Sequence, residues 1–192
     1  MIHSFAESLA LSHAQEDAPW WAEVYSRAFP GFHSMMSVRD DGWAQRGGVD
    51  RVITLKSGKT VTVDEKVRSQ SFPDILLERW SNRERQAPGW IQKDLACDFI
   101  AYAFVLDARC YLFPFLPLRA AWLANGRDWI ARGAAGEDGF RTVLAQNGGY
   151  TTESVAVPIP ELLAAVHRAQ VVDLLYAARH VLAHFIDHED HR

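Results

Sequence analysis

The sequence has little cysteine, no long apolar run and no large excess of positive charge. Its two cysteines, Cys97 and Cys110, form neither a C-x-x-C pair nor a disulfide framework, a pattern that favours a reducing cytosol and buried free thiols. The longest apolar runs, FIAYAFVL and YLFPFLPL, have the length of a strand and fall well short of the roughly 20 residues of a membrane-spanning helix. The first residues, MIHSFAESLALSHAQ, lack the basic start of a secretory signal. We therefore expect a soluble, cytoplasmic protein with no membrane partner.

The charge is low on average and uneven along the chain. A net charge of −4 excludes a protein that is basic throughout, as a nucleic-acid coat would be. Between Gln45 and Lys93, however, ten Lys and Arg stand against six Asp and Glu, a local charge of +4 that leaves −8 for the remainder. Such a basic segment is either a solvated face or a contact surface for a polyanion. Composition alone leaves both interpretations open.

Length and patterning predict one α/β or α+β domain. The chain has 192 residues, of which 48% are hydrophobic, enough for one sizeable core. We expect helices and strands in the following order: a helix over 16–29, hairpin strands over 49–55 and 60–68, strands over 73–81, 97–105 and 109–115, a helix over 117–133, a short extended piece over 152–159, and helices over 160–169 and 170–192. Helix, strands, then helices is typical of a mixed sheet flanked by helices.

The hairpin strands have a register that the apolar pattern restricts. A two-residue turn would set Ile53 opposite Thr62 and mix apolar with polar side chains. A three-residue loop over 57–59 sets Ile53 opposite Val63 and keeps the apolar side chains on one face. We therefore predict the three-residue loop.

This predicted register gathers charge at the strand ends far from the loop. It sets Asp50 opposite Lys66 with Asp64 diagonally adjacent, and it turns Glu65 to the other face, toward Arg51. Two carboxylates together with the Glu65 backbone carbonyl suit a hard cation such as Mg²⁺ or Mn²⁺. The alternative is a surface ladder of ion pairs, Asp50 with Lys66 and Arg51 with Glu65. Spacing alone does not decide between them.

The same residues resemble a known superfamily. Asp50, followed after thirteen residues by Asp64-Glu65-Lys66, resembles the PD-(D/E)XK nucleases, in which an acid on one hairpin strand and a (D/E)-x-K triplet on the next bind divalent metal and cleave phosphodiesters. The lead-in Q-x-x-G-V-D-R-V, the strand DILLE and the GW before the next strand are similar as well. The chain looks most like small nuclease-like proteins of phages and mobile elements. Two features depart from the pattern: GGV stands where a proline is common, and the link before residue 97 is short for a second helix.

The resemblance implies a fold, an activity and a set of site residues. It implies a restriction-endonuclease-like mixed sheet flanked by helices over 1–168, with a C-terminal helix and His-rich tail over 169–192. It implies hydrolysis of double-stranded or branched DNA with Mg²⁺ or Mn²⁺, and an endonuclease rather than an exonuclease. Asp50, Asp64 and the Glu65 carbonyl would be the metal ligands, and Lys66 would be the catalytic base or the group that orients water.

Further side chains are candidates for supporting roles, each with a plain structural alternative. Glu23, on the first helix, is a possible extra metal ligand, whereas a solvated helix position is the alternative. Gln45 and Glu78 are candidates for contacts near the metal. The expected phosphate contacts are Arg68, Arg83, Arg85 and Lys93. Two tryptophans, Trp80 and Trp90, either stack on bases or belong to the core.

The C-terminal segment raises separate questions. His180, His184 and His188 share one face of a helix, which suits zinc or nickel but is also an ordinary exposed stripe. An apolar stripe on that helix packs either on the domain or on a second copy, as in a homodimer. The functional alternative to a nuclease is a catalytically inactive nucleic-acid-binding or protein-interaction module on the same fold. A structural phage protein is a third possibility, and no residue pattern supports it.

Overall fold

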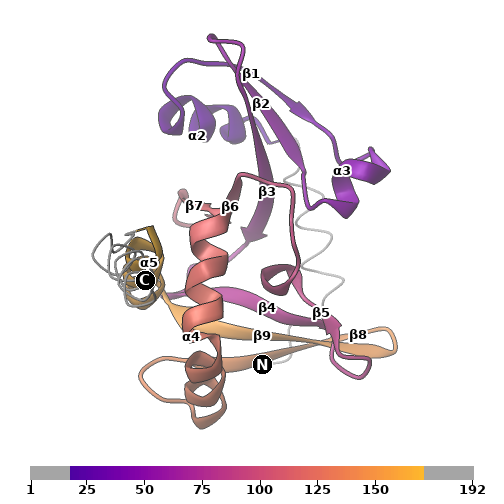
Figure 1. The fold of residues 1–192 in the computed structure, drawn as a ribbon, viewed down its shortest axis with the longest axis vertical. Coiled ribbons are helices and arrows are strands. Elements are labelled where there is room, and N and C mark those ends of the chain that lie inside the picture. Colours follow the sequence, from indigo (N-terminus) through magenta and orange to yellow (C-terminus); the bar gives the residue numbers. More distant parts are fainter. Residues whose placement is uncertain (1–17, 171–192) are drawn as a thin grey trace, which may run out of the picture.

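Residues 18–170 are described by a computed structural model that contains two β-sheets and five helical segments (Figure 1). The first sheet has the order β1-β2-β3-β6-β7, with bounds Phe32–Ser37, Arg51–Leu55, Thr60–Arg68, Phe99–Phe104 and Arg109–Pro114. The second has the order β5-β4-β9-β8, with bounds Ala87–Pro88, Asp74–Asn82, Tyr150–Pro158 and Arg141–Asn147. The helical segments are α2 (Trp20–Ala28), α3 (Gly42–Arg46), η1 (Trp90–Gln92), α4 (Phe115–Ala135) and α5 (Ile159–Gln170). A mixed α+β class is therefore confirmed.

The first sheet is mixed, and α2 covers one of its faces. Strand β2 runs antiparallel to both β1 and β3, β6 lies parallel to β3, and β7 returns antiparallel to β6. Trp21 and Tyr25 of α2 are four residues apart, so they share one face of the helix. They pack with Ile53, Val63 and Ala101 of the sheet in one core cluster. Burial of this apolar face fixes α2 against the hairpin.

Strand β6 joins two cores because both of its faces are buried. Ala101 packs beneath α2, whereas Ile100, Tyr102 and Phe104 belong to the larger core. That core also contains Leu77 of β4 and residues of α4, β9 and α5. A continuous apolar run such as FIAYAF is typical of a strand with two buried faces. The larger core thus holds the second sheet and α4 against the first sheet, as Figure 1 shows.

The expectation of one sheet holding all the strands is wrong. The strand predicted over 73–81 is β4, which pairs with β9 and β5 instead of with the hairpin. The extended piece predicted over 152–159 is the long strand β9, central to the second sheet. Three strands were not predicted, β1, β5 and β8, and all lie at sheet edges with largely exposed side chains. Exposed edge strands carry too weak an apolar alternation to be seen in the sequence.

The predicted hairpin register is wrong by two residues. Ile53 pairs with Val61 instead of Val63, and the loop spans 56–58. Gly58 ends this loop with φ +82°, and the Leu55 amide donates to the Lys59 carbonyl at 2.8 Å. A left-handed glycine at the third position is typical of a three-residue hairpin loop. A shift of two residues leaves every side chain on its predicted face, so only the partners across the strands change.

No helix within residues 18–170 combines the length and the apolar character needed to cross a membrane.

Candidate metal and nucleic-acid site

A cleft of about 580 Å³ lies where the end of β3 faces the second sheet. Its wall on the hairpin side consists of Asp50, the β3 residues 64–68 and residues of α3. Its opposite wall comes from β4, β8, β9 and η1. Five cationic side chains and four carboxylates line it: Arg39, Arg46, Lys66, Arg68, Lys93, Asp50, Asp64, Glu65 and Glu78. The cleft is thus the place where the predicted catalytic triplet meets much of the basic segment.

Asp50 and Asp64 lie side by side because of the observed register. Arg51 pairs with Val63, so the next position along sets Asp50 opposite Asp64, not opposite Lys66 as predicted. The Asp50 amide donates to the Val63 carbonyl at 2.9 Å, and the Glu65 amide donates to Asp50 Oδ2 at 2.8 Å. The backbone of β3 therefore holds the Asp50 carboxylate in place. Asp64 itself is only 3% exposed.

Lys66 forms an ion pair with Asp64 on the same face of β3. Burial raises the pKa of Asp64 to about 7, and the nearby charge of Asp50 adds to the rise while Lys66 opposes it. Burial works to lower the pKa of Lys66, but the negative charges of Asp64 and Asp50 outweigh it and the pKa of Lys66 is raised. The ammonium is therefore in its charged form at neutral pH. It lies 5.9 Å from the centre of the Trp90 ring.

The two carboxylates fit a hard divalent cation. Asp64 is buried and Asp50 lies beside it in a partly exposed position, so the two like charges repel one another, and a cation between them removes that repulsion. Mg²⁺ commonly takes one or two carboxylates and completes its shell with water and substrate phosphate. Within residues 18–170 no group of three or more His, Cys, Asp or Glu side chains is arranged to hold a metal ion. The donor set available here is therefore two carboxylates with neighbouring backbone oxygen, Glu65 included.

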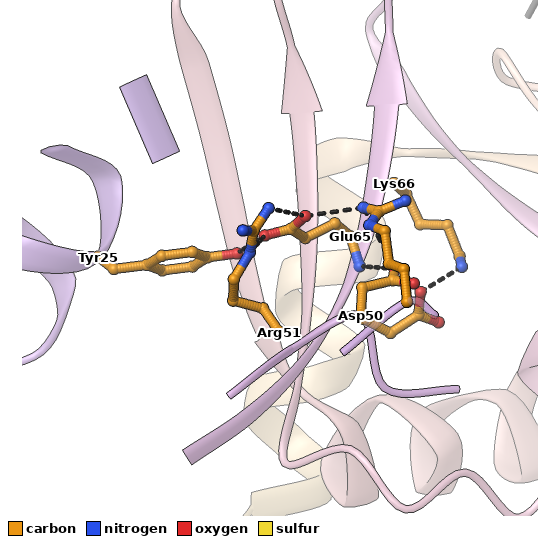
Figure 2. Close-up of polar contacts among 7 residues, drawn as sticks. Tyr25, Asp50, Arg51, Glu65 and Lys66 are labelled. Atoms are coloured by element: carbon orange, nitrogen blue, oxygen red, sulfur yellow. Dashed lines mark hydrogen bonds and ion pairs between the residues drawn. The ribbon is translucent and has the colours of Figure 1, made fainter. Parts of the chain in front are cut away.

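Glu65 belongs to the wall of the cleft that β3 forms, but its side chain is fully buried and points away from the cleft into a hydrogen-bond network. Tyr25 Oη donates to Glu65 Oε1 at 2.6 Å, and Arg51 contacts both carboxylate oxygens at 3.0 and 3.1 Å. Arg39 donates to Glu65 Oε2 at 2.7 Å and lies 3.6 Å from Asp50 Oδ2. Figure 2 shows Tyr25 reaching Glu65 from the α2 side, with Asp50 and Lys66 on the other side of Glu65. The predicted contact between Glu65 and Arg51 is confirmed.

The structure brings some of the predicted supporting residues to the cleft. Gln45, Glu78, Arg68 and Lys93 all line it. Glu78 Oε1 accepts a hydrogen bond from the Trp90 amide at 3.3 Å, and its charge contributes to the raised pKa of Lys66. Arg68 is paired with the buried Asp74 at 3.2 Å. Arg68 is thus held in place by a structural ion pair.

Other predicted supporting residues lie elsewhere. The side chain of Glu23 is 62% exposed, pairs with Arg27 on the same helix and lies outside the cleft lining, so Glu23 takes the solvated helix position that was the alternative to a metal ligand. Arg83 lies outside the cleft lining and pairs with Glu153 at 2.8 Å. Arg85 is exposed in the turn after β4 and is also outside the lining. Trp90 is 9% exposed and belongs to the core.

Arg39 and Arg46 are site residues that the sequence did not reveal. Arg39 lies in the connection between β1 and α3, a segment with no periodic pattern, and it meets Glu65 across 26 residues of sequence. Arg46 ends α3 and lines the cleft. Arg46 belongs to the basic segment between Gln45 and Lys93, whereas Arg39 lies outside it, and only the folded chain shows that both face the cleft.

The predictions for the C-terminal segment lie outside the residues that the structure describes. They concern the helix over 170–192, its stripe of His180, His184 and His188, and a dimer through that helix; the described chain ends at Gln170, the last residue of α5.

Comparisons of the chain with protein-family models, curated proteins and solved structures give no match.

Proposed function

We propose that this chain is a Mg²⁺- or Mn²⁺-dependent DNA nuclease that hydrolyses phosphodiester bonds at Asp50, Asp64 and Lys66, on a restriction-endonuclease-like core. The observation that carries the proposal is the adjacent pair of Asp50 and Asp64 beside the Lys66 ammonium on the wall of an open cleft. A carboxyl such as Asp64, whose pKa is raised by burial and by a neighbouring charge in a cleft, is a candidate functional residue.

Each residue of the cluster has a distinct part in the proposed reaction. Asp50, Asp64 and the Glu65 carbonyl would hold the divalent cation, and the chemistry supplied there would be positive charge for the phosphate and activation of water. Lys66 is charged, so it is suited to hold a phosphate oxygen and to orient the attacking water. Acting as a general base would first require Lys66 to lose a proton, which the neighbouring acids oppose.

The cleft also suits the backbone of DNA. Arg46 and Lys93 line it together with Lys66, and cationic side chains facing phosphates supply most of the sequence-independent affinity for nucleic acid. Asp50 and Asp64 would oppose a polyanion, but a cation bound between them removes that repulsion. We therefore propose DNA, double-stranded or branched, as the partner, and binding that is strengthened by divalent metal.

The test is cleavage of supercoiled plasmid and of branched DNA with Mn²⁺ and with Mg²⁺. We expect the wild type and Glu23→Gln to cleave, and Asp50→Ala and Asp64→Ala to be inactive while circular dichroism shows them folded. Glu23 is a matched control because it is an acid outside the cleft lining. Retained cleavage in either aspartate variant would refute the assignment of Asp50 and Asp64 to the active site. An inactive wild type would refute the proposed nuclease activity.

A catalytically inactive binding or interaction module is the second candidate. The ion pair between Lys66 and Asp64 favours it, because the pair neutralises one acid without any metal. An inactive wild type that still binds DNA through the same cleft is the outcome that supports this candidate.

A further inference from the structure

A tryptophan on α3 is exposed beside the cleft. Trp43 is 82% exposed, more than any other large hydrophobic residue within residues 18–170. The helix that carries it is well fixed: Asp41 Oδ1 accepts a hydrogen bond from the Trp43 amide at 2.8 Å, and the Ala96 amide donates to the Gly47 carbonyl at 2.7 Å. The ring is therefore held out toward solvent by an anchored segment. Single exposed apolar residues are common on protein surfaces, but tryptophan is enriched at binding interfaces because its large ring has a polar N–H, so the surroundings of Trp43 decide its role.

The immediate neighbour of this ring is a cation that faces the cleft. The Arg46 guanidinium lies 4.8 Å from the centre of the Trp43 ring, and both Arg46 and Gln45 line the cleft. Trp43 does not line the cleft itself, but it contacts a residue that does, so its ring is adjacent to the site that holds Asp50 and Asp64. An aromatic face next to an arginine presents a stacking surface for a base together with a charge for the adjoining phosphate.

We propose that Trp43 stacks on an unpaired base, so that the substrate class of this cleft is DNA with a single-stranded segment, such as an overhang, a flap or a junction. The inference rests on the proposed function and narrows its substrate. In continuous duplex the faces of the bases are covered by their neighbours, whereas an unpaired base offers a free face. Trp90, for which the sequence left base stacking or a place in the core open, is buried in the core, whereas the Trp43 ring is exposed.

The experiment measures DNA binding by fluorescence anisotropy in EDTA, where no metal-dependent cleavage occurs. The labelled probes are a single strand, a duplex with a flap and a blunt duplex. Trp43→Ala is expected to weaken binding of the single strand and the flap about tenfold, which corresponds to about 1.4 kcal/mol. Binding of the blunt duplex should change less than about twofold. Trp43→Phe, which keeps an aromatic face, should retain most of the affinity.

Leu123→Ala is the matched control, because Leu123 is 73% exposed on α4 and does not line the cleft. Equal losses on all three probes, or no loss on any, would overturn the stacking role. If the wild type cleaves DNA while Trp43→Ala binds every probe normally, the stacking inference fails and the nuclease stands. If Trp43→Ala loses the single strand but the wild type never cleaves, the stacking holds and the nuclease fails. A wild type that binds none of the probes overturns the stacking role, and one that also fails to cleave DNA with Mn²⁺ or Mg²⁺ overturns both.

Discussion

Replacing Asp64 by asparagine should change how the stability of the metal-free protein depends on pH. The pKa of Asp64 rises from 3.8 to about 7 on folding, because the carboxyl is buried beside Asp50. For an acid with a raised pKa, the folded state binds the proton more tightly than the unfolded chain. Burial of Asp64 therefore does not lower the free energy of unfolding below about pH 4. It lowers that free energy more and more as the pH rises to about 7, and by a constant amount above that pH. Asparagine is always neutral, so Asp64→Asn avoids that decrease.

The magnitude follows from the shift. About three pKa units at about 1.4 kcal/mol each give an upper limit on the order of 4 kcal/mol above neutral pH. Asparagine also changes hydrogen bonds to Lys66, but that difference is nearly constant with pH. The informative quantity is therefore the difference in free energy of unfolding between Asp64→Asn and the wild type, followed as a function of pH.

The assay is urea unfolding followed by circular dichroism, in EDTA, at a series of pH values from about 4 to about 8. We expect the free energy of unfolding of Asp64→Asn, minus that of the wild type, to increase as the pH rises and to level off above about pH 7. Glu23→Gln, an exposed acid exchanged in the same way, should show no such trend. A difference in the free energy of unfolding between Asp64→Asn and wild type that stays constant from about pH 4 to about pH 8 would refute the raised pKa of the buried Asp64 carboxyl.

Two further predictions concern the cations of the cleft. Lys66→Ala should lose turnover but still bind Mn²⁺ by calorimetry, because the ammonium acts on phosphate and water and is not a ligand; cleavage at the wild-type rate would make Lys66 a structural residue. Arg46→Ala with Lys93→Ala should flatten the dependence of log affinity on log salt by about two units, one for each lost phosphate contact. The matched double variant of Arg83 and Arg85, which lie outside the cleft lining, should change that slope little. Both slopes are measured by fluorescence anisotropy at a series of salt concentrations. If the two double variants change the slope equally, the DNA also contacts the β4–β5 turn, and the cleft is not the main binding surface.

The sequence predicted the individual elements of the fold better than their assembly. Strands β3, β4 and β6 and helices α2, α4 and α5 were all expected near their observed positions, because each has a strong apolar pattern or run. The division into two sheets was not predicted, since it depends on β4 pairing with β9 about 80 residues later. Contacts between segments so far apart leave no local signal in one sequence.

The same distinction applies to the site. Spacing on the hairpin placed Asp50, Asp64 and Lys66 on one face and Glu65 on the other, since alternation along a strand survives a shift of two residues. The wrong register nevertheless gave Asp50 the wrong neighbour. Arg39 approaches Asp50 and Glu65 from a loop, so only the tertiary structure could identify it.

The most direct test of the central claim is Mn²⁺ binding measured by electron paramagnetic resonance on the full chain without DNA. The account predicts that the wild type and Glu23→Gln bind Mn²⁺ alike, and that Asp50→Asn and Asp64→Asn each bind it much more weakly, because each keeps its shape but loses one of the two anionic ligands. Wild-type affinity for Mn²⁺ in both asparagine variants would contradict the claim that this pair of acids is a metal site.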